Sequence, residues 1–479
     1  MSQQVAGSAR SRARQAAAGG QWREAYELFR EADGQRQVGL ADLPELADVA
    51  YASGDLDGAI EAWERAYAGF TAAGEAAAAA GAAVRVALHL LFDTALMAPV
   101  RGWLARAEAL LDPAGVSPAQ AWFAVVRTYE RLLTGDRAGA RVWADRAVEV
   151  GVVVAPAAEA IGHVALARLL ILDGEVEPGL ALLEQAGLAA TSGELDPLST
   201  GVVYCELVCA LQGLAQYDLA EQWTEAMERW SRGNAVGSVH GRCRVHRAEI
   251  LRLRGWCHQA QAEALGACGR FGPTCGGSWG GAERTGPYPV APGDLPGAEQ
   301  ALMAAHQAGW DAQPGLALVL LAHGDVPAAV TSIREALDTP QWVPSKEMPP
   351  ATDLRRAPLL DAQVEIALAA GDIELARAAA EELHRVATRF RSKALTASAT
   401  QARARVRLAA GDADQAQPLF SEAARLWRDV GAPYEEAVAR LGLAEACHAR
   451  GGRQRALLEQ RSAQSIIDQI RAAPRSEPT

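Results

Sequence analysis

Five cysteine and histidine side chains in the middle of the chain have types and spacings that could form a metal site. Cys205 and Cys209 lie four residues apart in GVVYCELVCALQG, and His240, Cys243 and His246 follow at intervals of three in VHGRCRVHRAEI. On a helix both spacings put side chains on one face, so thiolate and imidazole ligands could converge. The alternative is that small cysteines fill close contacts between helices. Because no C-x-x-C spacing occurs, we favour packing and expect no bound metal.

Patterns that would indicate catalysis or nucleotide binding are weak. No serine or cysteine lies in a recognisable activating context, and no G-x-x-x-x-G-K-[ST] phosphate loop occurs. Neighbouring acidic residues such as Glu381-Glu382 and Glu435-Glu436 could act as acid and base, but on a helical protein they are typical of solvated faces. We therefore expect no enzyme, no catalytic residue and no cofactor.

Tryptophan recurs at similar positions of successive segments. An aromatic ring could stack on a ligand, but recurrence at equivalent positions favours packing between repeated elements. The residues concerned are Trp63, Trp143, Trp223 and Trp427.

A six-residue pattern, G-D-x-x-x-A, repeats along the chain. Strict copies begin at Gly54, Gly135, Gly293, Gly324, Gly371 and Gly411, with looser copies at Gly20, Gly174 and Gly255. Glycine can end one helix in a left-handed conformation, the aspartate can cap the next helix, and the small residue lets two helices approach. Apolar helical segments precede the glycine and amphipathic ones follow it.

The spacing between copies identifies the architecture. The step is 34 residues from Gly20 to Gly54, 39 from Gly135 to Gly174 and 40 from Gly371 to Gly411. Helix-turn-helix units of about 34 to 45 residues are typical of tetratricopeptide-like solenoids. The sequence therefore predicts an all-α, tetratricopeptide-like (TPR-like) α-solenoid of about eleven helical hairpins.

Two segments depart from the pattern and suggest a division of the chain. Residues 268–292 are rich in Gly and Pro and contain Cys268 and Cys275, at most half of a zinc site; no lysine accompanies the glycines, which argues against a phosphate cradle. Residues 338–358 are rich in proline, which predicts a linker. We expect a repeat array over 1–337 with an irregular insertion at 268–292, the linker, and further hairpins over 359–470.

Composition limits the function classes. The chain has 479 residues and a formal net charge of -12, which counts against nucleic-acid binding by the protein as a whole. No apolar run long enough to span a membrane is expected, and the odd number of scattered cysteines, 7, indicates reduced thiols. We expect a cytoplasmic protein, and the Ala, Gly and Arg content suggests a GC-rich, actinobacterial genome.

Several longer strings resemble a known family. They are GDLDGAIEAWERAYAGF, GWLARAEALLD, STGVVYCELVCALQGLAQYDLAEQWTEAMERW, GRCRVHRAEILRLRGWCHQAQAEA and GWDAQPGLALVLLAHGDVPAAVTSIREALD. Together they resemble the helical-repeat region of actinobacterial LuxR-family, MalT-like transcriptional regulators, over about residues 20 to 460. Such regulators usually end in a DNA-reading helix-turn-helix domain, and this chain ends with RSAQSIIDQIRAAPRSEPT where that domain is expected to begin. The resemblance implies a sensor or interaction module that lacks the domain.

The expected partner follows from the solenoid and the resemblance. The first hypothesis is a partner protein or a second copy of the chain, bound along the solenoid groove. The alternative is a small-molecule effector bound in the groove. Direct DNA binding would need a basic surface; the densest basic run is Arg242, Arg244, Arg247, Arg252 and Arg254, which a solvated helix face explains as well.

Overall fold

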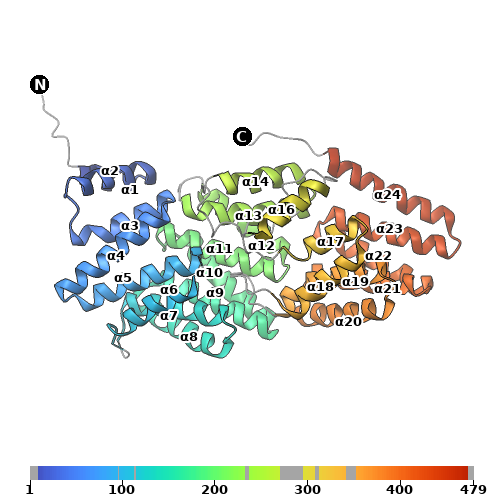
Figure 1. The fold of residues 1–479 in the computed structure, drawn as a ribbon, viewed down its shortest axis with the longest axis horizontal. Coiled ribbons are helices and arrows are strands. Elements are labelled where there is room, and N and C mark those ends of the chain that lie inside the picture. The colour runs from blue at the N-terminus through green and yellow to red at the C-terminus, as the bar shows by residue number, and fades with distance from the viewer. Residues whose placement is uncertain are drawn as a thin grey trace, which may run out of the picture. The chain divides into compact units, whose positions relative to one another are not determined.

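The structure is a computed structural model, and it describes residues 9–94, 96–112, 115–231, 237–269, 295–307, 312–340 and 352–472. Within these ranges every regular element is a helix (Figure 1). In the first part of the chain the helices are α1 (Ala9–Ala18), α2 (Trp22–Gly34), η1 (Leu40–Asp42), α3 (Leu43–Ser53), α4 (Leu56–Ala73), α5 (Ala76–His89), η2 (Leu90–Thr94), α6 (Met97–Glu108), α7 (Pro118–Leu133), α8 (Arg137–Val154), α9 (Pro156–Asp173) and α10 (Val176–Ser192). The later helices are α11 (Pro197–Gly213), α12 (Tyr217–Ser231), α13 (Gly237–Leu253), α14 (Cys257–Gly269), α16 (Leu295–Gln307), α17 (Gly315–Ala322), α18 (Val326–Asp338), α19 (Asp353–Ala369), α20 (Ile373–Phe390), α21 (Lys393–Ala409), α22 (Ala413–Val430), α23 (Pro433–Ala449) and α24 (Arg453–Ala472).

The turns between paired helices have the predicted Gly-Asp geometry. The glycine has a φ between 77 and 96° at Gly54, Gly135, Gly324, Gly371 and Gly411. The following aspartate accepts a hydrogen bond from the backbone N–H three residues on, at 2.9 to 3.2 Å, which caps the second helix. These five turns confirm the prediction, and the sixth copy, at Gly293, falls outside the described residues.

The small residue of the repeat lies where two helices meet. Its side chain is 0% exposed in all five described turns, at Ala59, Ala140, Ala329, Ala376 and Ala416. Each second helix contacts its own first helix and, in much of the chain, the first helix of the next hairpin, as α20 contacts α19 and α21. The chain is therefore a TPR-like α-solenoid, as the repeat predicts.

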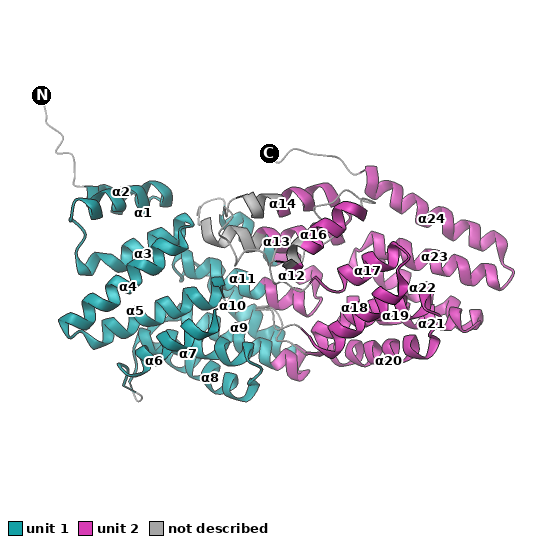
Figure 2. Ribbon diagram, in the orientation of Figure 1, with its two compact units in different colours: residues 1–169, 177–207, 223–243 teal, residues 170–176, 208–222, 244–479 magenta. Residues whose placement is uncertain are grey.

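The helices form two compact units (Figure 2). Unit 1 comprises Met1–Leu169, Glu177–Leu207 and Trp223–Cys243, and unit 2 comprises Leu170–Val176, Val208–Gln222 and Arg244–Thr479. In unit 1 a core forms around Phe29, Leu46 and Trp63 of α2 to α4. In unit 2 one core contains Leu253 and Trp427, and another contains Phe420.

Unit 2 packs inter-helix turns from the middle of the chain against the C-terminal hairpins. Arg389 of α20 donates to the carbonyl of Leu172 at 3.1 Å. The hydroxyl of Ser392 donates to the carbonyl of Ala215 at 2.9 Å, and Arg254 donates to the carbonyl of Val430. These bonds satisfy carbonyls at or beside helix ends and hold α20 to α22 beside segments that precede them by more than 170 residues.

One helical segment is, by length and composition, apolar enough to cross a membrane. The expectation that the chain has no apolar run of that length was wrong. It runs from Ala76 to Thr94, and most of it is buried among other helices of unit 1. It also carries Arg85, whose guanidinium lies over the ring of Trp122 at 4.7 Å. Because alanine dominates its apolar content, the segment packs closely, as core helices do.

The proline-rich segment is partly helical. Helix α19 begins at Asp353, so the last six residues of the expected linker are helical, and Pro358 lies inside the helix. Proline costs a helix one backbone donor, here the bond to the carbonyl four residues earlier, without ending α19. Residues 341–351 and most of the 268–292 insertion fall outside the described residues, and the proposed division into arrays at 337 and 359 stays a prediction.

Candidate functional site

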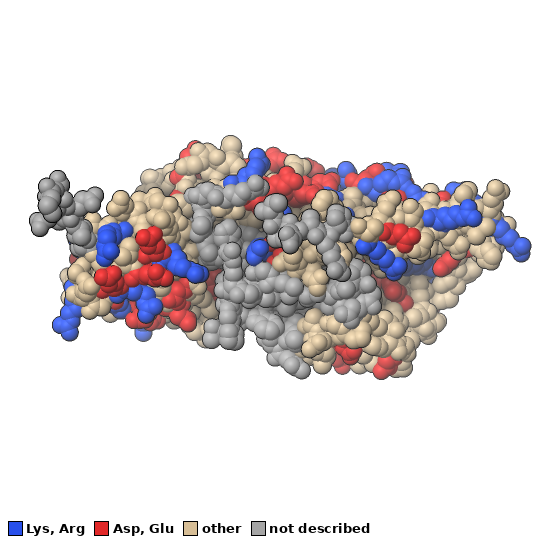
Figure 3. All heavy atoms as spheres, turned by 90° about the horizontal axis from the view of Figure 1, so that it is seen from above, with Lys and Arg blue, Asp and Glu red and all other residues tan. Residues whose placement is uncertain are grey.

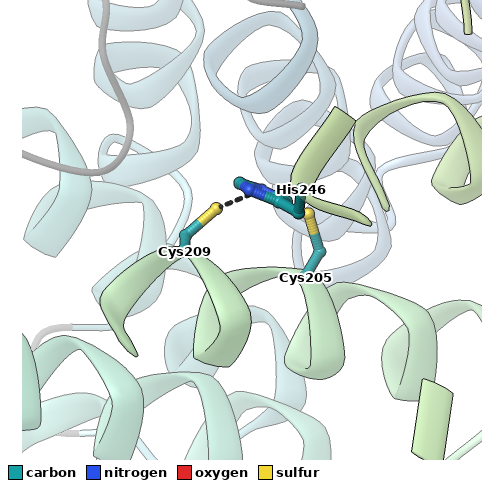
Figure 4. A group of neighbouring side chains, drawn as sticks. All are labelled: Cys205, Cys209 and His246. Carbon is teal, nitrogen blue, oxygen red and sulfur yellow. Dashed lines mark hydrogen bonds between the residues drawn. The ribbon is translucent and has the colours of Figure 1, made fainter. Parts of the chain in front are cut away.

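Three of the five candidate metal ligands converge. Cys205 and Cys209 lie one turn apart on α11, so the helix itself fixes their relative position, and His246 lies on α13 (Figure 4). The Cys209 Sγ and His246 Nε2 atoms are 2.9 Å apart. All three side chains are buried, and their ligand atoms lie within 4.8 Å of one another. The one-turn spacing of Cys205 and Cys209 on α11 is therefore as predicted, and of the candidates on α13 the described one, His246, lies beside them.

A buried glutamine holds the imidazole of this cluster. Gln212, also on α11, donates from Nε2 to the backbone carbonyl of His246 at 2.9 Å. Only the amide nitrogen can donate to a carbonyl, so Oε1 is the atom that contacts His246 Nδ1. Nδ1 therefore donates to Oε1, and Nε2 is the ring nitrogen that faces Cys209 Sγ. The sequence analysis did not identify Gln212. Its position three residues after Cys209 puts it on the same face of the helix, and that spacing could have indicated it.

The other two candidates of the sequence cluster cannot be placed. His240 and Cys243 belong to α13, but their side chains fall outside the described residues. The side chain of Cys268, near the end of α14, and the whole of Cys275 fall outside them too. The string GGSWG at residues 276–280 has the form G-x-S-x-G, which sequence reasoning overlooked, and it also lies outside them.

Unit 1 also contains a buried ion pair that the sequence analysis did not identify. Arg168 of α9 donates to Glu206 of α11 at 2.7 Å, and both side chains are buried. Burial, reinforced by the charge of Glu206, raises the pKa of the neighbouring Tyr129 hydroxyl well above its ordinary value. Because charges removed from water must be paired, this contact fixes the register of α9 against α11.

A second group of polar residues, here called the charged cluster, gathers on unit 2. Arg405 of α21 lies 3.6 Å from Asp361 and 3.7 Å from Glu365, both on α19. Arg252 of α13 donates to Glu435 of α23 at 3.4 Å. The charged cluster consists of Arg252, Asp361, Glu365, Arg405, Tyr434 and Glu435.

In two members of the charged cluster part of the side chain is exposed to solvent, although burial raises the pKa of the ionisable group. The Asp361 side chain keeps 36% of its surface exposed, but burial raises the pKa of its carboxyl against the opposing effects of Arg405 and Ser398. Tyr434 is 54% exposed, and burial, with Glu435 and Glu365, raises the pKa of its hydroxyl. The Asp361 Oδ1 atom is buried although part of the side chain is exposed, so surrounding protein removes water from the charge-bearing atom.

The guanidinium of Arg405 makes no hydrogen bond to its two acidic neighbours. Its contacts among the described residues are the two long ion pairs to α19, both beyond hydrogen-bond distance. Asp361 Oδ1 likewise has no hydrogen-bond partner in that part of the chain. A guanidinium offers five N–H groups in a planar fork that suits a carboxylate. The charged cluster can therefore accept a polar or acidic group from another molecule.

The basic run of α13 does not offer a free basic surface. Its described members pair with carboxylates: Arg244 and Arg247 with Glu263, Arg252 with Glu435, and Arg254 with Asp218 and Glu221. The side chain of Arg242 lies outside the described residues. Over the described part of the face in Figure 3, basic and acidic side chains are interspersed. Phosphate binding would have to displace these carboxylates.

The prediction that both acidic pairs lie on solvated faces was wrong for Glu435-Glu436. Glu436 is buried rather than solvated, because it accepts from Arg428 at 2.7 Å and from Arg440 at 2.9 Å. Its neighbour Glu435 belongs to the charged cluster. Glu381 is exposed as expected, whereas Glu382 is half-buried and accepts from Arg356 at 2.8 Å.

The recurring tryptophans pack as predicted. Trp63 and Trp427 are buried, and the indole of Trp427 donates to Gln401 at 2.7 Å. The other two are partly buried and contact aromatic rings of the preceding first helix, Trp143 against Phe123 and Trp223 against Tyr204.

Two solved structures are distantly similar to the chain. One is a chain from the crystal structure of the APC/C hetero-tetramer Cut9-Hcn1, with 13% identity, 96% of this chain and 86% of that chain covered, and a TM-score of 0.45. The other is from the crystal structure of Rap protein complexed with competence and sporulation factor, with 12% identity, coverages of 91% and 99%, and a TM-score of 0.34. No family model and no curated protein matches. Likeness this distant carries no argument about function.

Proposed function

We propose that this chain is a non-catalytic interaction module that binds a polar segment of a partner protein through the charged cluster of unit 2. The observation that carries the proposal is Arg405, whose guanidinium lies near two carboxylates of α19 without a hydrogen bond to either. Exposed Tyr434 stands beside it and offers an aromatic ring. Tyrosine and arginine are the residue types that most often dominate protein interfaces.

The wider role that we propose is in a cytoplasmic transcriptional regulator. Its support is the resemblance of the five quoted strings to the repeat region of LuxR-family, MalT-like regulators. In such a regulator the module would couple binding of a partner, or of a second copy of the chain, to the regulator's output. DNA binding by the basic run at α13 receives no support, because its described members, Arg244, Arg247, Arg252 and Arg254, already pair with carboxylates.

The experiment uses affinity capture from the source organism with three forms of the full chain. Arg405→Ala removes the proposed donor. Arg425→Ala is the matched control, because Arg425 of α22 is 53% exposed and pairs with Glu422 and Asp429 of its own helix. We expect one protein to be captured by the wild type and the control, and to bind Arg405→Ala about tenfold more weakly, as for a moderate interface hot spot.

Two results would contradict the proposal. One is a partner that binds the wild type and Arg405→Ala equally well. The other is the absence of any captured protein together with a monomer in light scattering. A metabolite that raises the melting temperature of the wild type but not of Arg405→Ala would instead favour the small-molecule hypothesis.

A further inference from the structure

Hydrogen bonds fix the orientation of the His246 imidazole beside Cys205 and Cys209, which packing alone would not require. Cysteine alone is a common filler between helices, but a buried imidazole must have both ring nitrogens satisfied. Here Gln212 takes Nδ1, and the Gln212 amide is itself held by the His246 backbone. The result is a buried imidazole of fixed orientation whose Nε2 faces sulfur, which is how outer-shell partners orient a metal-binding histidine.

The distances suit a small ion. With bonds of about 2.3 Å to sulfur and 2.0 Å to nitrogen, neighbouring ligand atoms around zinc lie about 3.5 to 3.8 Å apart. The three atoms here lie within 4.8 Å of one another, and the closest pair is 2.9 Å apart. Side-chain shifts of about 1 Å would therefore convert the cluster into three vertices of a zinc tetrahedron.

We propose that Cys205, Cys209 and His246 bind one thiophilic metal ion, with Zn²⁺ as the ion. Thiolate and imidazole ligands favour Zn²⁺ or Cu⁺ over Mg²⁺ and Ca²⁺. Two thiolates and a neutral imidazole cancel the charge of Zn²⁺, whereas Cu⁺ would leave a net negative charge in a buried place. Binding releases the two thiol protons to solvent, and one coordination position remains for water or a further ligand.

The consequence concerns α11 and α13. Cys209 and His246 belong to the first helices of successive hairpins and lie 37 residues apart in the chain. An ion between them would tie these helices together more tightly than the thiol–imidazole contact does. The local order of α11 and α13 around these residues would then depend on the bound metal.

The test measures metal binding by the full chain after chelator treatment, under reducing and anaerobic conditions. Zn²⁺ is titrated against a chromophoric chelator, Co²⁺ reports thiolate ligation by its charge-transfer absorption, and a separate titration uses Cu⁺. The variants are Cys209→Ser, His246→Gln and Gln212→Leu. Cys447→Ser is the control, because Cys447 of α23 is a buried thiol that belongs to a different packing cluster.

We expect the wild type and Cys447→Ser to bind one equivalent of Zn²⁺ with the same affinity. Cys209→Ser and His246→Gln should lose that site, and Gln212→Leu should weaken it about 10- to 100-fold, as loss of an outer-shell partner does. Zn²⁺ should also slow alkylation of Cys205 and Cys209 in the wild type, measured by mass spectrometry, and that readout needs no variant that could misfold.

Failure of the wild type to bind Zn²⁺ or Cu⁺, or equal binding by Cys209→Ser and His246→Gln, would overturn the site. One equivalent of Cu⁺ without Zn²⁺ binding would uphold the site and overturn the choice of ion. None of these outcomes depends on capture of a partner protein, so the metal site and the proposed interaction are tested independently.

Discussion

Asp361 is a residue whose charged form does not stabilise the fold. Its carboxyl is desolvated by surrounding protein, and the nearest cation, Arg405, is 3.6 Å away and makes no hydrogen bond to it. Burial therefore outweighs the ion pair, and the pKa of Asp361 is raised in the folded protein. An ionised Asp361 then destabilises the fold at neutral pH, unless a bound partner supplies the missing donor.

Replacing Asp361 by asparagine should raise the melting temperature at pH 7.5. Because the folded-state pKa is above the unfolded one, the cost of ionisation is fully present above the folded pKa and disappears as the pH falls through it. The gain in melting temperature should therefore shrink toward about pH 4, near the unfolded pKa of aspartate. Differential scanning fluorimetry across this range measures it.

The control for Asp361→Asn is Glu374→Gln, which alters a carboxylate on α20 that is 80% exposed. Its effect should be small and should not have the same pH dependence, because its carboxylate is solvated. A melting temperature for Asp361→Asn below that of the wild type at pH 7.5 would mean that the ion pair with Arg405 outweighs burial.

At the scale of the element, the hairpin depends on the small residue five places after the turn glycine. Ala376 of α20 is 0% exposed, whereas Ala378 two residues later is exposed. Ala376→Leu should lower the free energy of unfolding by about 1 to 3 kcal/mol, because the larger side chain must separate packed helices. Ala378→Leu should change it by less than about 0.5 kcal/mol. Urea unfolding followed by circular dichroism compares the two, and equal effects would show that helix propensity, not packing, decides.

The hairpins were predictable because their signals are local. Gly371 and Asp372 form a turn whose conformation and cap depend on residues within one turn of helix, and the structure has both as predicted. Pro358 shows the limit of a local rule, since α19 continues through it where tertiary packing offsets one missing donor. Propensity is a weak prior wherever packing is strong.

The candidate sites were harder to predict because they join residues about one repeat apart. Cys209 and His246 are 37 residues apart, and Arg168 and Glu206 are 38 apart, close to the repeat step of 39. Stacking of hairpins places such residues side by side. Searching at the repeat interval would have found both pairs, and it would also have paired Arg405 of α21 with the acidic residues of α19, which lie one hairpin earlier.

At the scale of the whole molecule, a solenoid should lose stability locally. Each hairpin of a repeat protein contacts mainly its neighbours, so stability is a sum of local terms rather than a property of one core. In unit 2, α20 packs on α19 and α21, and Arg389 also binds the carbonyl of Leu172. A defect introduced in α20 should therefore spread to these contacts and stop there.

Native-state hydrogen exchange of Ala376→Leu tests this extent. We expect faster exchange than in the wild type over α19 to α22, a smaller increase at the turn that contains Leu172, and no change over α3 to α8 of unit 1. Ala378→Leu serves again as the control and should leave all three regions unchanged. Uniformly faster exchange over α3 to α8 would show instead that the array opens as one cooperative structure, in which case a partner bound at the charged cluster would stabilise every hairpin of the chain.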